Sequence, residues 1–134
     1  MSTIQKYSTD LEEDDLPRAS SVSAAAVVLD EMLQPVTDSL YVLQGKWRLP
    51  ILLALATGPK RFGELAKALS TITDRMLAKE LKELEVNLVI TRAVFEDMPV
   101  KVEYTLTEHG ISLHGVLIEL QQWGLQHRKK VGLR

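Results

Sequence analysis

The chain has 134 residues and no cysteine, and 46% of its residues are hydrophobic while only 5% are aromatic. This length suits one domain with an aliphatic core. The absence of cysteine excludes disulfides, thiolate metal sites and cysteine nucleophiles. No apolar run approaches the roughly 18 residues that a membrane span needs. The first ten residues contain no apolar signal-peptide core, so we expect a cytoplasmic protein.

The charge is unevenly distributed along the chain. The net charge is −2, yet residues 1–18 alone contain five acids against two cations. The rest of the chain is therefore slightly basic, and a basic face can bind nucleic acid even on an acidic protein. We expect residues 1–20 to form an acidic flexible tail and residues 21–134 to form a single domain.

The first half of the sequence has the apolar spacing of helices. Helix-forming residues begin at Ser21, and Pro35 is expected to break this helix, so that a second one covers residues 36–43. Gly45 follows in a position that favours a left-handed helix end. Apolar residues at i, i+3, i+4 and i+7 predict further helices over residues 47–56, 62–69 and 74–85, with Asn87 as the cap of the last.

From residue 89 the hydrophobic period changes from 3.6 to 2. Residues 89–95 and 100–106 are rich in β-branched and aromatic side chains, and residues 96–99 form a short turn, which predicts one β-hairpin. Thr107 then caps a final helix that is expected to end near Gln126. The apolar stripe of this helix contains Leu113, Val116, Leu117, Leu120 and Trp123.

This order of elements predicts a mainly helical α+β fold, the winged helix-turn-helix, with extra helices at both ends. The third core helix would read the major groove and the hairpin would be the wing. On residues 74–85 the face opposite the leucines carries Arg75, Lys79 and Lys82 around the small Ala78, which suits close approach to base edges. The alternative is that these cations only solvate an exposed helix face.

Four stretches of the chain resemble the HxlR-type winged-helix transcription regulators of the MarR-like superfamily. Residues 43–47 read LQGKW, residues 58–65 read GPKRFGEL, residues 75–85 read RMLAKELKELE and residues 102–110 read VEYTLTEHG. The similarity runs in register from about Gln34 to Trp123. It implies a homodimeric DNA-binding regulator of bacterial transcription, with a DNA-binding core over about residues 36–106 and dimerisation helices over about residues 22–34 and 107–127.

The resemblance has one departure that bears on regulation. Family members often have a cysteine directly before the Pro-Val pair that precedes the first core helix, and in several it senses oxidants or electrophiles. Gln34 occupies that place here, so a thiol-based signal is excluded. We expect any effector to be a small molecule that binds near the dimerisation helices.

The expected functional residues fall into two sets. Double-stranded DNA would be contacted by Arg61, Thr73, Arg75, Lys79, Lys82, Arg92 and Lys101, with Arg75 at a base edge and Lys101 at phosphate. The homodimer would be built on the stripe Leu113, Val116, Leu117, Leu120 and Trp123, because such a stripe together with an apolar helix near residues 24–33 exceeds what monomers usually expose.

Other chemistry has little support in the sequence. Gly45-Lys46 lacks the upstream glycine of a phosphate-binding loop. The two histidines His109 and His114 are five residues apart, which places them on different helix faces and not in a metal set. No G-x-S-x-G pattern indicates a hydrolase, so we expect no enzyme activity, no metal and no cofactor. A winged-helix module that binds protein instead of DNA is the remaining alternative, which the net negative charge favours.

Overall fold

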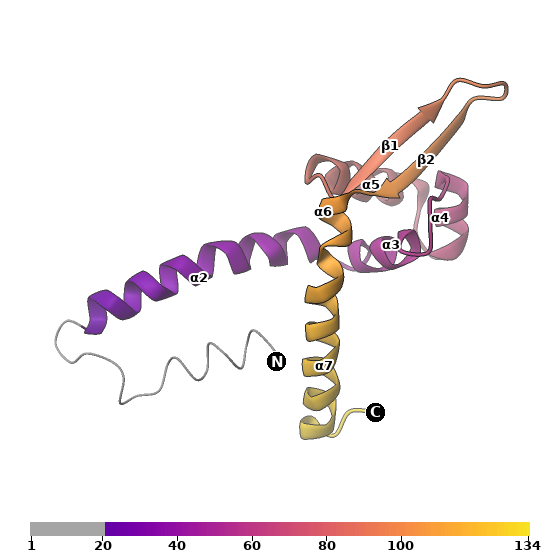
Figure 1. The fold of residues 1–134 in the computed structure, drawn as a ribbon. Helices are drawn as coiled ribbons and strands as arrows, with labels where there is room; N and C mark the ends of the chain where they lie inside the picture. Colours follow the sequence, from indigo (N-terminus) through magenta and orange to yellow (C-terminus); the bar gives the residue numbers. More distant parts are fainter. Residues whose placement is uncertain (1–20) are drawn as a thin grey trace. The chain divides into compact units, whose positions relative to one another are not determined.

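The computed structural model describes residues 21–134, and the chain divides into two compact units at the boundary between Tyr41 and Val42 (Figure 1). The expected acidic tail, residues 1–20, lies outside the described residues. Helix α2 (Ser21–Leu43) precedes a run of elements that ends the chain. In order these are α3 (Arg48–Leu55), α4 (Phe62–Ala68), α5 (Asp74–Val86), β1 (Ile90–Phe95), β2 (Lys101–Leu106), α6 (Glu108–Ile111) and α7 (Leu113–Val131). The mainly helical α+β class is confirmed.

Helix α2 is continuous through Pro35, so the predicted break at this residue is wrong. Proline removes one backbone donor from a helix, but its fixed φ is compatible with helical geometry. Two side-chain hydrogen bonds span the turn that follows: the Ser39 hydroxyl donates to the Pro35 carbonyl at 2.9 Å, and the Gln34 amide donates to Asp38 at 2.9 Å. Gly45, two residues beyond the helix, has a φ of +92°, as its expected role requires.

The second unit is built around aliphatic side chains from α3, α4 and α5. The face of α5 that contains Leu77, Leu81 and Leu84 is fully buried. Burial of each such side chain contributes about 1.5–3 kcal/mol, so packing rather than intrinsic propensity holds this 13-residue helix in place. The leucines form one core with buried residues of α3, α4 and β1 and with the residue before β1: Ile51, Leu52, Leu55, Leu65, Ile90 and Val89.

The two ends of α5 are closed by polar caps. The Thr73 hydroxyl oxygen accepts a hydrogen bond from the Met76 backbone N–H at 3.1 Å. At the other end Asn87 is the cap, as the sequence predicts, and its side-chain amide donates to the Glu83 carbonyl at 2.8 Å. The left-handed residue is the next one, Leu88, with a φ of +63°.

The hairpin has the predicted antiparallel form. Strands β1 and β2 pair from Ile90↔Leu106 at the base to Phe95↔Lys101 near the tip. An isolated bridge also joins Lys60 to Tyr104, with backbone N–H···O distances of 3.0 and 2.8 Å. The sequence did not predict this bridge, which attaches the segment before α4 to the wing.

The final helix is interrupted, so the prediction of one helix from residue 107 to about 126 is wrong in two respects. Helix α6 ends at Ile111, α7 begins at Leu113, and α7 continues to Val131. The Ser112 hydroxyl donates to the His109 carbonyl at 2.5 Å, a back-bond of the kind that bends helices. Gly110 lies so close to Val89, the residue before β1, that a Cβ there would collide with the Val89 carbonyl oxygen.

We predict that Leu88→Gly stabilises the protein. Leu88 is 70% exposed, so its side chain contributes little packing, and an L-residue in the left-handed region is strained. Relief of that strain should raise the free energy of unfolding by about 0.5–1 kcal/mol, measured by urea denaturation.

Leu88→Ala is the matched control, because it removes the same exposed side chain and keeps the Cβ that causes the strain. It should leave the stability nearly unchanged. An equal gain from alanine and glycine would show that the exposed leucine, and not the backbone conformation, is the source of the effect.

Candidate nucleic-acid interface

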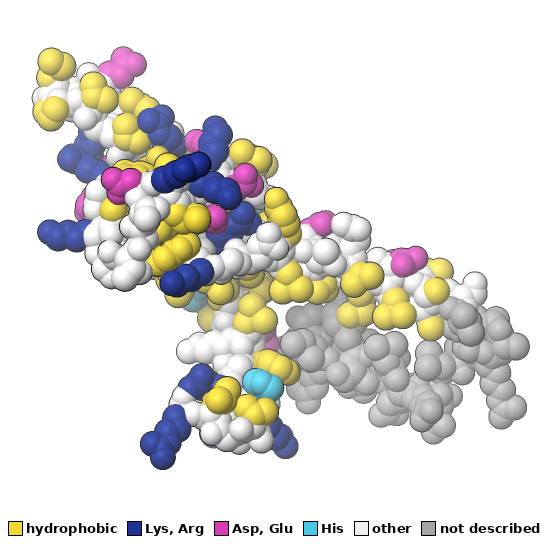
Figure 2. All heavy atoms as spheres, turned by 180° about the vertical axis from the view of Figure 1, so that it is seen from behind, with side chains coloured by type: hydrophobic (Ala, Val, Ile, Leu, Met, Phe, Trp, Pro, Cys, Tyr) yellow, Lys and Arg dark blue, Asp and Glu magenta, His cyan; other side chains and the backbone are white. Residues whose placement is uncertain are grey.

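Helix α5 presents a basic face on the side opposite its buried leucines. Arg75, Lys79 and Lys82 are all exposed, as is Ala78 among them. The spacing of four and three residues places the three cations along one side of the helix. This is the arrangement that the sequence predicts for the reading helix. Figure 2 shows Lys and Arg side chains close together on the second unit, with a few Asp and Glu among them.

These cations differ in the ion pairs that they form within the protein. Lys82 lies 3.4 Å from the Glu85 carboxylate in an exposed pair, a contact worth little in water. Arg75 and Lys79 make no ion pair with any of the residues that the structure describes. They are therefore the two side chains on this face that can meet an external anion without breaking an internal contact.

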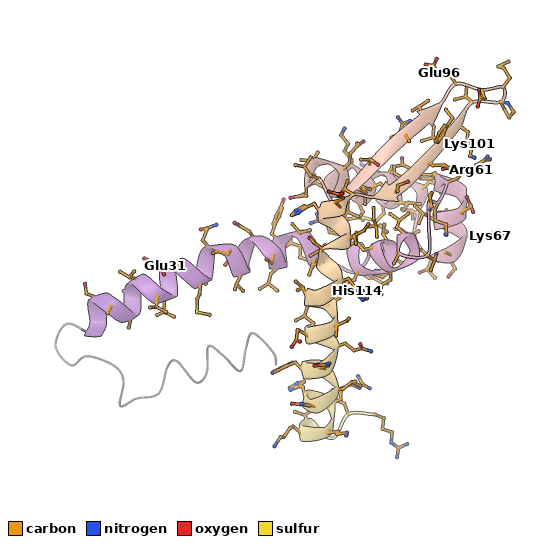
Figure 3. All side chains as sticks on the ribbon, in the orientation of Figure 1. Glu31, Arg61, Lys67, Glu96, Lys101 and His114 are labelled. Carbon is orange, nitrogen blue, oxygen red and sulfur yellow. The ribbon has the colours of Figure 1, made fainter. Side chains whose placement is uncertain are left out.

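Thr73 and Arg61 lie at the starts of the two helices of the helix-turn-helix. Thr73 accepts the capping bond described above, and its hydroxyl hydrogen remains available to donate to a ligand. Arg61 precedes α4, with an exposed side chain, while its backbone N–H donates to the Glu64 carboxylate at 3.0 Å. Figure 3 shows Arg61 and Lys101 beside the same strand, β2, where the Lys60–Tyr104 bridge holds the segment before α4.

The structure does not bring Arg92 and Lys101 together on the wing. Arg92 pairs with Tyr104 and Lys101 with Phe95, so the alternation of side chains along a strand puts the two cations on opposite faces of the hairpin. Lys101 is also engaged within the protein. Its Nζ lies 2.8 Å from Glu103 and 5.6 Å from the centroid of the Phe95 ring.

The tip of the wing is acidic and apolar rather than basic. Glu96 and Asp97 are followed by Met98, which is 93% exposed. Figure 3 shows Glu96 at the far end of the hairpin. Carboxylates repel phosphate, so the wing offers cations along its strands and not at its tip.

A buried ion pair between α3 and α5 was missed by the sequence analysis. Arg48 Nε donates to Glu80 Oε2 at 2.8 Å, and both side chains are largely buried. Two signals were present in the sequence: Arg48 shares the apolar face of α3 with Ile51, Leu52 and Leu55, and Glu80 lies three residues after Leu77 on the edge of the apolar face of α5.

The predicted dimer stripe on α7 is divided by the fold. Leu113 and Leu117 are half-buried and pack against the core of the second unit. Val116, Leu120 and Trp123 remain exposed. The Trp123 ring stacks on His127 with a centroid separation of 4.9 Å and an interplanar angle of 11°.

An apolar cavity of about 260 Å³ opens between α3, α6 and α7. Its wall includes Leu52 and Leu53 from α3, Ile111 from α6 and Leu117 from α7, with the exposed His114 as the titratable group. Such a lining suits an apolar guest with few polar atoms.

Residues 21–134 contain neither a metal-ligand cluster nor a helix that could span a membrane. No group of three or more His, Asp or Glu side chains in this range is placed to hold a metal ion. None of the helices in the same range combines the length and apolarity that crossing a bilayer needs.

Known proteins share this architecture and sequence. The family model for HxlR-like helix-turn-helix proteins matches residues 42–131. The Bacillus subtilis protein YtcD, an uncharacterized HTH-type transcriptional regulator, is 45% identical over 96 residues that cover 72% of this chain and 76% of the relative. The HTH-type transcriptional regulator YodB of the same organism is 45% identical over 93 residues, which cover 69% of this chain and 83% of YodB.

Solved structures of related regulators superpose on this chain. The reduced form of YodB superposes with a TM-score of 0.67 at 41% identity, over 69% of this chain and 91% of that chain. The redox regulator HypR in its reduced form superposes with a TM-score of 0.66 at 36% identity, over 74% of this chain and 98% of that one. Because the family model spans more than half of the chain, this protein belongs to the HxlR-like helix-turn-helix family of transcriptional regulators.

Proposed function

We propose that this DNA-binding regulator recognises a palindromic operator as a homodimer, with α5 of each protomer in the major groove and the wing beside the sugar–phosphate backbone. The observation that supports this most strongly is the geometry of α5. Three buried leucines hold one side of the helix against the core. The opposite side is exposed to solvent and carries Arg75, Lys79 and Lys82. Two-fold symmetry would set the half-sites about one helical turn apart.

The positions of the cations suggest separate roles for them. Recognition helices contact bases mainly through their N-terminal residues, and Arg75 is the second residue of α5. An arginine in that place can bond two acceptors of a guanine. Lys79 lies one turn further along, where an ammonium group suits phosphate, and Arg61, Arg92 and Lys101 would add backbone contacts that position the domain.

The protein-binding alternative is not favoured. The acidic wing tip is the feature that suits it best, since Glu96 and Asp97 would attract a basic partner. Both Bacillus relatives, however, are named as transcriptional regulators, and the exposed cations of α5 occupy the place where a recognition helix needs them.

The affinity for DNA should depend strongly on salt. If the cations of a dimer neutralise about 6–10 phosphates, the dissociation constant for an operator duplex should rise by about 10³-fold or more between 50 and 200 mM salt. Fluorescence anisotropy with a duplex selected from a randomised library measures this. A dissociation constant that does not change with salt would contradict DNA binding through this face.

Arg75 and Lys101 should respond differently to replacement by alanine. Arg75→Ala is expected to cost about 1–3 kcal/mol on the selected duplex and to relax the preference at one base pair. Lys101→Ala should weaken binding to all sequences about equally and lower the salt slope by about 1.

Lys130→Ala is the control for general loss of charge. Lys130 lies near the end of α7, about 25 Å along the helix axis from Leu113. Its replacement should change neither the base-pair preference nor the salt slope. If Arg75→Ala left the base preference intact, Arg75 would be assigned to phosphate instead.

The homodimer is supported by apolar side chains that remain exposed on two helices. On α2, Leu29, Leu33, Val36 and Leu40 are between 49% and 62% exposed. Their spacing of four, three and four residues is that of a coiled-coil seam. On α7, Val116, Leu120 and Trp123 are also exposed, by between 44% and 53%. Monomeric proteins rarely leave stripes of this length in water.

Leu33→Glu should weaken the dimer, because it places a charge in the seam. We expect the dimer dissociation constant, measured by sedimentation equilibrium, to rise by about tenfold or more. Val27→Glu is the matched control: Val27 is similarly exposed, at 53%, but lies on the opposite side of α2. Equal effects of the two variants, or a wild-type chain that is monomeric at micromolar concentration, would contradict the proposed seam.

The same proposal includes regulation by a signal that is not sensed through a cysteine thiol. The sequence contains no cysteine, and Gln34 stands where several family members have one. The cavity between α3, α6 and α7 supports a small apolar effector, because its wall is largely aliphatic and lies at the base of an exposed α7 surface.

A further inference from the structure

The ion pair between Arg48 and Glu80 is unusual in its burial. Among the described residues, Arg48 is the buried charged side chain, with 7% of its surface exposed. Its guanidinium Nε lies 2.8 Å from Glu80 Oε2, and the Glu80 side chain is 14% exposed. The two residues are 32 positions apart and belong to α3 and α5. The pair therefore joins α3 to α5 at the edge of the core.

Stability alone does not account for such a pair. Removal of two charges from water is costly, and apolar residues of similar volume are often equally or more stabilising in the same place. The pair differs from apolar packing in being directional, because a charge-assisted hydrogen bond restricts both distance and angle. Leucines can slide over one another, whereas this bond is kept only in a narrow range of helix orientations.

The orientation that it restricts is the rotation of α5 about its own axis. Glu80 lies on the flank of α5, between the buried leucines and the basic face, so a rotation of the helix displaces its carboxylate relative to Arg48. A rotation of about 20° displaces atoms at the helix surface by about 2 Å. Base contacts tolerate far less, since functional groups must be held within about 0.5 Å of their productive geometry.

The pair also removes a charge that would oppose DNA. Glu80 follows Lys79 directly, and an unpaired carboxylate at this position would weaken the field of the neighbouring ammonium group. With Arg48 beside it, the carboxylate is locally neutralised inside the protein.

We propose that the Arg48–Glu80 pair is a positioning device that sets the rotation of α5 and thereby the ability of the protein to discriminate between DNA sequences. This inference rests on the proposed function, because it concerns how α5 reads its operator. Arg48 and Glu80 are positioning residues in this role and do not themselves contact DNA.

The decisive variant is the double replacement Arg48→Met/Glu80→Met. It removes one cation and one anion, so the net charge and the salt slope should stay the same. Binding to a shuffled duplex should also remain within about twofold of wild type, because this binding is electrostatic. Discrimination, the ratio of affinities for the selected and the shuffled duplex, should fall by about tenfold or more as the alignment of a base contact is lost.

Two single variants keep the test valid if the double variant is poorly folded. Glu80→Gln preserves an acceptor for Arg48 Nε, and it should keep discrimination within about threefold of wild type. Arg48→Lys keeps the charge but loses the planar donor geometry, and it should lower discrimination by more than Glu80→Gln does. Circular dichroism and thermal unfolding of each variant measure folding separately from binding.

Each outcome either supports or overturns the inference. A folded double variant with reduced discrimination and unchanged binding to the shuffled duplex supports it, as does reduced discrimination in Arg48→Lys alone if the double variant does not fold. Wild-type discrimination in the folded double variant, or in Arg48→Lys when the double variant does not fold, overturns it and leaves the pair a structural contact. Failure of the proposed function is distinct, since the wild-type protein would then prefer no duplex selected from the library.

Discussion

The burial of three leucines on one side of α5 is the contact on which the rest of the second unit depends. Leu77, Leu81 and Leu84 fill the space beside α3 and α4 and at the base of the hairpin. A 13-residue helix is marginal by itself in water, so these side chains decide whether α5 exists and which of its sides faces outward. The position of its cations is a geometric consequence of that burial. Only three residues separate the end of α5 from the start of the wing, which packs on the same core.

Hydrophobic spacing was sufficient to predict α3, α4, α5 and the hairpin to within one or two residues, because each element buries one face. It failed at two residues where local hydrogen bonds determine the path of the helix. Helix α2 passes through Pro35, and Ser112 interrupts the last helix. The Lys60–Tyr104 bridge and the Arg48–Glu80 pair join distant residues, and no local pattern contains such information. For the candidate site, the exposed face of α5 could be predicted as the complement of its buried face. The placement of Arg92 and Lys101 on opposite faces of the wing required the strand register.

The distribution of acids explains how a chain with a net charge of −2 can belong to a family of DNA-binding regulators. Glu80 is held by Arg48, Glu103 by Lys101, and Glu85 lies near Lys82. Glu96 and Asp97 follow the end of β1, at the tip of the wing. These acids are thus paired within the protein or lie away from the basic face of α5, so Arg75 and Lys79 keep their charge for an external anion.

Gly110 allows an unusually close contact between α6 and the residue before the wing. Since even a methyl group at this residue would collide with the Val89 carbonyl oxygen, main chain lies directly on main chain where α6 passes the start of β1. The Thr107 hydroxyl adds a hydrogen bond of 2.6 Å to the Leu88 carbonyl at the same place. Apart from the Leu106 side chain, which lies beside Gly110, this contact joins backbone to backbone. A displacement at the base of α7 would therefore be transmitted into the strand that follows α5.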